Sequence, residues 1–417
     1  MATKTIDAQF QLTGGRPSGF DYLRIILSVS VIAYHTIVVC YGRDADFSLW
    51  AANNPLRPLL EFIIPSFFAL SGFLVAGSLF RNTLPGFLAL RATRILPALS
   101  CEIFISALII GPALTSVSLD AYFSDKSFYA YFLNILGDIH YHLPGVFMNN
   151  PYPDRVNQQL WTIPYEMQCY IALSLLAAFR IVQKRRLFVL VFFFATLFAY
   201  GYSAWWAGFD QTHWGPSGRL CVLAFLSGVI IYTWREKIPH SLPLFLGSLI
   251  VAYALMGRME TEYFAAFPVA YATVWLGLQN PRKIFLIAGA DYSYGMYLYG
   301  YPIQQAMMQL FPFNHAWYAN LALSLVGSAI FAYLSWNLVE LKIMNQKKRA
   351  ISFVNAAYNH VDSKFLSRLP SIFHKTWAFI VGIGDKVDQC LCQIAGTIWR
   401  NASAPAEAPQ CSADKEG

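Results

Sequence analysis

Apolar runs long enough to cross a lipid bilayer recur along nearly the whole chain of 417 residues. A membrane-spanning helix needs about 17–25 predominantly apolar residues, and its backbone polar groups must be paired within the segment. Charged residues make up only 13% of the chain, against roughly 25% in soluble domains. The sequence therefore predicts an all-α, polytopic membrane protein. About ten transmembrane helices are expected, centred near Val31, Ala69, Ala107, Leu173, Phe194, Leu226, Leu249, Ala270, Tyr297 and Phe331.

Lysine and arginine gather in alternate loops between these runs, and the other loops are richer in acids. Basic loops stay in the cytoplasm, so ten spans predict both termini on that side, in a cell membrane, or the inner membrane of a Gram-negative bacterium. The net charge of +7 lies largely in these loops, so we expect lipid and no nucleic acid as a partner. The basic loop residues are Lys4, Arg16, Arg81, Arg91, Arg94, Arg180, Lys184, Arg185, Arg186, Arg235, Lys237, Arg282, Lys283, Lys342, Lys347, Lys348 and Arg349.

Three parts follow from this pattern: a cytoplasmic N-terminal segment (1–20), a ten-helix membrane domain (21–345) and a polar cytoplasmic extension (346–417). Polar residues fill the first segment, so no cleavable signal peptide is expected. The extension is predicted to be partly amphipathic helix, near 351–366 and 377–399, and partly disordered. The longest outer loop, about 116–159, is predicted to be either a cap or re-entrant segment, or a plain linker.

Arg24 and His35 lie eleven residues apart in the first apolar run, which is three helical turns, so both side chains project from one helix face. An ionisable residue at membrane depth costs at least about 2.5–3.5 kcal/mol, which favours a functional role. Histidine is a competent general base near neutral pH. The alternative for His35 is a packing residue bonded to a neighbouring carbonyl group.

Glu166, in the run LWTIPYE, is expected at a depth similar to that of His35 and could orient its ring. The alternative is a buried structural carboxylate. Trp161 could contact substrate or could be an ordinary interfacial tryptophan. Asp291 and Glu340 lie at the cytoplasmic ends of later spans, and either acid could balance nearby arginines.

Arg91 and Arg94 stand three residues apart and so share one side of a helix. Arginine binds phosphate oxygens in a two-point fork, so this pair, joined by Arg24, suits a phosphate-rich ligand. Cytoplasmic positive charge alone is the alternative explanation, mainly for Arg91. In the second span, Ser71, Gly72 and Gly77 predict close helix packing, the alternative being room for a ligand chain.

The seven cysteines show no metal-ligand spacing or paired pattern. We therefore expect neither a metal site nor disulfides.

Six segments in order resemble the acyltransferase-3 family of integral membrane acyltransferases, over about residues 20–342. They are the arginine-histidine pair of the first span, then FFALSGFL, RATRILPAL, LWTIPYE, DYSYGMYLYGYPIQQ and WNLVE. Two positions depart from the family pattern. Gly300 stands where many members have histidine, and Leu341 and Lys342 follow Glu340 where a basic residue and proline are common.

The resemblance implies transfer of an acyl group, usually acetyl, from cytoplasmic acyl-CoA to a hydroxyl of a cell-surface or lipid-linked carbohydrate such as exopolysaccharide. His35 is implied as catalytic base or acyl carrier with Arg24 and Glu166. Arg91, Arg94 and Arg24 are implied to hold the CoA phosphates. Trp161 and Tyr165 are assigned to substrate binding.

The main alternative function is a secondary transporter or flippase of a carbohydrate-linked substrate, because intramembrane charge also suits substrate passage. That class predicts two related halves, and the sequence shows no internal repeat. A receptor or scaffold that has lost activity predicts damaged motifs, and the leading motifs here are complete. The oligomeric state does not follow from the sequence.

Overall fold

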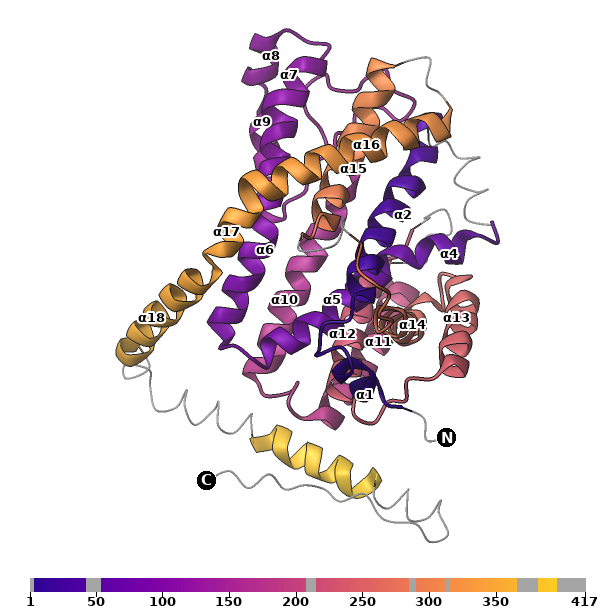
Figure 1. Ribbon diagram of the computed structural model, residues 1–417, viewed down its shortest axis with the longest axis vertical. Coiled ribbons are helices and arrows are strands. Elements are labelled where there is room, and N and C mark those ends of the chain that lie inside the picture. Colours follow the sequence, from indigo (N-terminus) through magenta and orange to yellow (C-terminus); the bar gives the residue numbers. More distant parts are fainter. Residues whose placement is uncertain are drawn as a thin grey trace.

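The computed structural model describes residues 4–42, 54–207, 215–284, 290–311, 316–365 and 382–395, and this part of the chain is helical with no strand. Figure 1 shows the helices as a bundle. The main helices are α1 (Ile6–Gln11), α2 (Gly19–Tyr41), α4 (Arg57–Glu61), α5 (Ile63–Leu79), α6 (Leu84–Ile105), α10 (Ile163–Ala178), α11 (Arg185–Tyr202), α12 (Gly218–Thr233), α13 (Leu242–Met256), α14 (Ala266–Gly277), α15 (Ser293–Leu310), α16 (Trp317–Ser335), α17 (Leu341–Asn345) and α18 (Lys347–Phe365).

All ten predicted span centres lie within helices, which confirms the helical class of the protein. Within the described residues, five helical stretches are long and apolar enough to cross a membrane. The remaining centres fall in shorter helices or in α15, so the count of ten spans and the side of each terminus stay predictions. The five stretches are Gly19–Tyr41, Arg57–Leu79, Leu84–Leu114, Arg185–Trp206 and Trp317–Asn345.

Helix α12 forms the centre of the bundle, and nearly every residue after its first turn is buried. It crosses α5 closely because each helix has a glycine at the crossing. A Cβ at Gly72 would meet the carbonyl oxygen of Phe225, and a Cβ at Gly228 would meet that of Ala69. Gly72 therefore allows the two helices to pack closely, as the sequence predicted, whereas its neighbour Ser71 lines a cavity.

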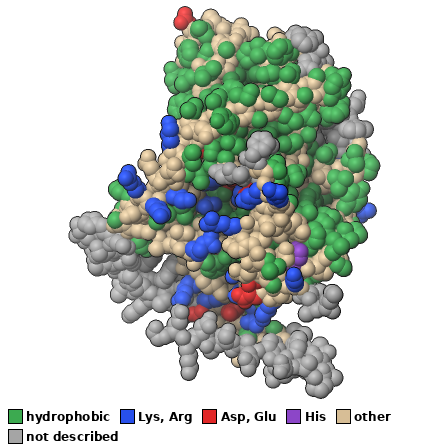
Figure 2. Space-filling view, in the orientation of Figure 1, with side chains coloured by type: hydrophobic (Ala, Val, Ile, Leu, Met, Phe, Trp, Pro, Cys, Tyr) green, Lys and Arg blue, Asp and Glu red, His purple; other side chains and the backbone are tan. Residues whose placement is uncertain are grey.

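Apolar side chains also cover the outside of the bundle. On α11, Phe193, Phe194 and Phe198 are 53%, 59% and 74% exposed. Figure 2 shows hydrophobic side chains over most of the upper part of one face and Lys and Arg gathered lower down, towards the end where Figure 1 shows α1 and α18. A surface of this kind is typical of helices that face lipid.

The long loop near 116–159 is not a plain linker. It forms the helices α8 (Leu119–Ser124) and α9 (Lys126–Tyr131), and its later residues enter the protein, where Val146, Phe147 and Val156 are fully buried. Asn157 donates hydrogen bonds to the Glu102 carboxylate on α6 and to a carbonyl of α15. The loop is therefore an inserted segment that joins two helices of the bundle.

The C-terminal extension forms α18 and a further helix over 382–395. Helix α18 packs on the start of α6, where Asn355 accepts a hydrogen bond of 2.6 Å from Thr83. Cys392 is disulfide-bonded, so the expectation of no disulfide is wrong at this position. That expectation rested on the spacing of the cysteines along the chain, which does not determine which cysteines lie close enough to bond in the folded protein.

Candidate active site

Two cavities lie between the helices, each with polar residues in its wall. The histidine cavity has a volume of about 440 Å³ and is lined by His35 of α2, aromatic residues of the inserted loop and the start of α12. The arginine cavity has a volume of about 150 Å³ and is lined by Arg24, Arg91, Arg94 and Glu166. The first volume lies in the range of roughly 300–1,000 Å³ that is usual for small-molecule sites.

Arg24 and His35 share one face of α2, as their spacing predicted, but they serve different cavities. Three helical turns separate them, so Arg24 reaches the arginine cavity and His35 the histidine cavity. One helix therefore connects the two.

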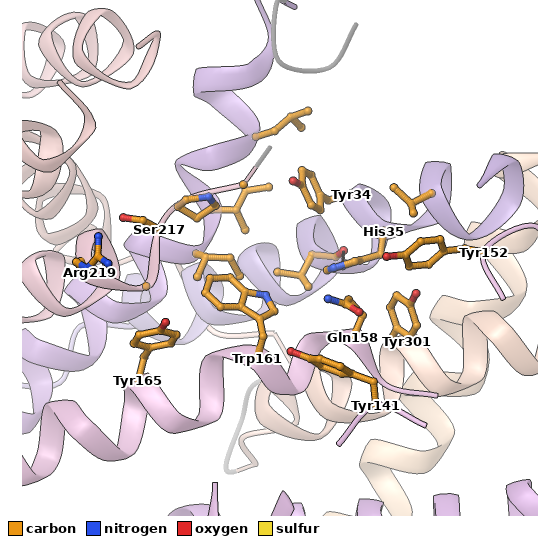
Figure 3. Close-up of a pocket in the computed structure, with 18 residues that line it drawn as sticks. Tyr34, His35, Tyr141, Tyr152, Gln158, Trp161, Tyr165, Ser217, Arg219 and Tyr301 are labelled. Atoms are coloured by element: carbon orange, nitrogen blue, oxygen red, sulfur yellow. Dashed lines mark hydrogen bonds between the residues drawn. The ribbon is translucent and has the colours of Figure 1, made fainter. Parts of the chain in front are cut away.

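Aromatic rings surround His35 in the histidine cavity (Figure 3). Tyr34 and Tyr301 stand edge-on to the His35 ring, at centroid distances of 5.3 and 5.4 Å. Trp161 and Tyr165 line the same cavity and pack edge-to-face with each other. A cavity with these flat apolar surfaces and a few polar groups suits a sugar ring, which has apolar faces and hydroxyls at its edge.

The His35 ring has a defined tautomer. Its Nδ1 lies 2.9 Å from the carbonyl oxygen of Val31 on the same helix. Because a carbonyl oxygen only accepts, Nδ1 carries the proton of the neutral ring and Nε2 carries the lone pair. A carbonyl partner of this kind was expected for a packing histidine, but here the ring also lines a cavity, so His35 can accept a proton there.

Asp291 organises the arginine cavity from a position two residues before the start of α15. Its carboxylate accepts hydrogen bonds from Arg94 Nη2 at 2.7 Å and from Arg24 Nη1 at 3.4 Å. Glu340, near the end of the domain, accepts from the other terminal nitrogen of Arg94 at 3.4 Å. Both acids named by the sequence therefore balance the arginine cluster.

Arg91 differs from the other two arginines of this cavity. No carboxylate of the described residues pairs with it, and its Nε is buried without a hydrogen-bond partner. The guanidinium lies about 6 Å from the rings of Phe87 and Tyr170. Among the described residues, Arg91 is thus the arginine of this cavity that forms no ion pair within 4 Å, although Glu166 lines the same cavity.

Glu166 lies in the arginine cavity, not beside His35. Its carboxylate accepts a 2.7 Å hydrogen bond from Tyr170, whose hydroxyl is 3.3 Å from that of Ser71. Among the described residues no hydrogen bond joins Glu166 to His35. The expected orientation of the histidine by this acid is therefore not seen: Glu166 lies one residue beyond Tyr165 on α10 and so points to another side of the helix.

A thin wall separates the cavities. Ile64 lines both of them, while the neighbours Trp161 and Thr162 line one each. The Tyr297 hydroxyl fixes this wall through bonds of 2.6 Å with Thr162 and 3.0 Å to the Gln159 carbonyl. Groups bound in the two cavities would approach each other here.

Several lining residues were not identified from the sequence: Tyr34, Tyr141, Tyr152, Gln158, Arg219 and Tyr301. Tyr34 and Arg219 could have been identified from the sequence, since Tyr34 is next to His35 and Arg219 is a single arginine at the start of an apolar run. The lining residues of the inserted loop could not have been identified in this way, because their positions depend on how the loop packs into the bundle. Gly300, one of the two positions that depart from the family pattern, packs against Ile32 and Gln159, and a Cβ there would lie 2.8 Å from Ile32.

Comparisons with known proteins identify the family of the chain. A family model described as an acyltransferase domain matches residues 18–339. An O-acetyl transferase of Shigella phage Sf6 is 27% identical over 348 residues, which cover 80% of this chain and 98% of that protein. No solved structure matches the chain significantly. The chain therefore belongs to the acyltransferase-3 family of integral membrane acyltransferases and is an O-acetyltransferase.

Proposed function

We propose that this enzyme transfers an acetyl group from cytoplasmic acyl-CoA to a hydroxyl of a carbohydrate, such as an exopolysaccharide unit or a lipid-linked oligosaccharide. The observation that carries the proposal is the placement of His35, with a free lone pair on Nε2, in a sugar-sized cavity one wall away from an arginine-lined cavity.

The donor end is assigned to the arginine cavity. Arg91 binds a CoA phosphate, because its buried Nε lacks a partner and would gain a charge-assisted hydrogen bond. Arg94 and Arg24 are held by Asp291 and shape the cavity around the donor. The thioester end then points to the wall at Ile64 and Thr162.

The acceptor end is assigned to the histidine cavity, with the sugar ring against Trp161 and Tyr165. His35 Nε2 removes the proton of the acceptor hydroxyl, and the hydroxyl oxygen attacks the thioester carbonyl carbon. The carbon–sulfur bond breaks, and the departing thiolate takes the proton from His35. The Nδ1–Val31 bond keeps the ring oriented through both proton transfers.

His35→Ala is expected to reduce acetyl transfer by a factor of about 10²–10⁴, the usual contribution of a general base. The measurement is acetate release from cell-surface glycans by mild alkali, with proton NMR, in cells that lack the gene and carry either form. Ile26→Ala is a matched control, since Ile26 is an exposed residue of the same helix and lines neither cavity.

Equal acetylation by wild type and His35→Ala would overturn the role of His35. Unchanged glycans in cells without the gene would count against a cell-surface carbohydrate as the acceptor. In that case, transport of labelled oligosaccharide into vesicles would test the transporter alternative.

A further inference from the structure

Arg219 lies in the first turn of α12 and lines the histidine cavity. Figure 3 shows it at the end of the cavity away from His35, beyond Trp161 and close to Tyr165. Tyr165 packs directly on α12 because residue 218 is glycine, where a Cβ would meet the tyrosine ring. The cavity thus has a base at one end and a permanent cation at the other.

Neutral groups hold the Arg219 side chain in place. Its Nη1 donates to the Ser203 hydroxyl at 2.8 Å and to the Tyr263 hydroxyl at 3.3 Å. The guanidinium also lies 4.4 Å from the centre of the Tyr202 ring. Because a guanidinium has five donor hydrogens, these contacts leave Nε and Nη2 available to a ligand.

No carboxylate of the described residues forms an ion pair with Arg219. Two buried acids lie near this end of the cavity. Glu61 pairs with Arg57 at 2.7 Å and accepts a hydrogen bond from the backbone N–H of Gly215, which lines the cavity, and Glu262 precedes Tyr263 in the chain. These acids offset part of the local positive charge, but neither forms an ion pair with Arg219.

The position of Arg219 is also unfavourable for a cation. The first turn of a helix carries partial positive charge, which disfavours arginine there and favours anions. A charged side chain in a mostly apolar wall adds a desolvation cost. A bound anion would offset both, and the cavity leaves room for one.

Resting on the proposed function, we propose that the acceptor is an acidic carbohydrate, whose carboxylate or phosphate group pairs with Arg219 while a hydroxyl of the same molecule reaches His35. Arg219 is then a specificity residue. A uronic acid supplies the carboxylate, and a sugar phosphate or a lipid-linked sugar supplies the phosphate.

The test uses the purified full-length protein in lipid nanodiscs, acetyl-CoA, and three acceptors that share their ring hydroxyls: methyl glucoside, methyl glucuronoside and methyl glucoside 6-phosphate. Both kcat/KM and binding are measured for each acceptor. Arg219→Gln removes the charge, and Arg219→Lys keeps it. Arg185→Gln is the matched control, since Arg185 lines neither cavity and forms an exposed pair with Glu236.

Wild type is expected to prefer an anionic acceptor over methyl glucoside, and Arg219→Gln to reduce that ratio about tenfold to hundredfold, the range of one charged hydrogen bond. Arg219→Lys should keep part of the preference and Arg185→Gln all of it. Whether methyl glucuronoside or methyl glucoside 6-phosphate is the better acceptor shows whether Arg219 binds a carboxylate or a phosphate.

A ratio near one in wild type, or a ratio that Arg219→Gln does not change, would overturn the role of Arg219. Failure to acetylate any of the three sugars would count against the proposed function. In that case the affinities of wild type and Arg219→Gln for the three sugars would still show whether Arg219 selects anionic ones.

Discussion

Asp291 fixes two arginines from two different helices at one point. Arg94 comes from α6 and Arg24 from α2, and both reach the same carboxylate oxygen. The Asp291 carboxylate therefore sets the shape of the arginine cavity, and of its three arginines Arg91 is the one without an ion pair among the described residues. Its side chain is about a quarter exposed, so the pairing is only partly screened by water.

Asp291→Asn is expected to raise the KM for acetyl-CoA about tenfold and to lower the free energy of unfolding by about 1–2 kcal/mol, because two guanidiniums lose a charged partner. Asp21→Asn is the control. Asp21 contacts Arg24 at 3.5 Å but is more exposed and not bonded to Arg94, so its effect should be clearly smaller. Initial rates and thermal unfolding in detergent give both quantities, and equal effects of the two changes would contradict this account.

Sequence reasoning identified the ionisable residues of the site better than their partners. The eleven-residue spacing correctly placed Arg24 and His35 on one face, and Asp291 and Glu340 were correctly named as acids for the arginine cluster. The pairing of Glu166 with His35 was expected from similar depth. Depth along a span does not fix the direction of a side chain, which depends on how α10 is rotated in the bundle.

At the scale of elements, the crossing of α5 and α12 depends on the absence of two methyl groups. The helices approach so closely that each glycine faces the backbone of the other helix. Backbone cannot move aside as a flexible side chain can, so this contact is the least tolerant part of the core.

Gly228→Ala is expected to destabilise the protein by about 1–3 kcal/mol, since the added methyl group collides with the Ala69 carbonyl. Gly247→Ala on α13 is the matched control, because nothing lies within 4 Å of a Cβ there. At that position the same change should stabilise the helix, by up to about 1 kcal/mol. Thermal unfolding in detergent measures both, and a loss of similar size at the two positions would argue against the crossing.

Hydrophobic runs identified where helices lie, and all ten predicted centres are helical. They did not distinguish an inserted loop from a linker, because both interpretations fit a stretch of mixed polarity. The insertion of the loop depends on contacts between distant residues, such as Asn157 with Glu102, which no local pattern reveals.

For the whole molecule, the distribution of basic residues makes an orientation testable. Arg81 and Ala121 are both exposed, and the prediction places Arg81 in the cytoplasm and Ala121 outside. In a background without other reactive cysteines, a membrane-impermeant maleimide should label Ala121→Cys in intact cells. Arg81→Cys should react only after the cells are opened, and the reverse pattern would overturn the orientation.

The class of the whole protein follows from the order of its six motifs, and the family match over residues 18–339 confirms it. The motifs carry no information about the extension beyond that range or about the residues that select an acceptor. In the proposed function, selection depends on Arg219, which stands outside the motifs and reaches the cavity only through the packing of α12.

The wall at Ile64, Thr162 and Tyr297 has a consequence beyond catalysis. In the proposed orientation the two cavities face opposite compartments, so an open passage between them would leak protons and other ions and dissipate the membrane potential. Because Ile64 lines both cavities, a single layer of side chains provides the electrical insulation. Only a group as small and uncharged as an acetyl unit would need to pass, and a cell could modify material outside without losing its ion gradients.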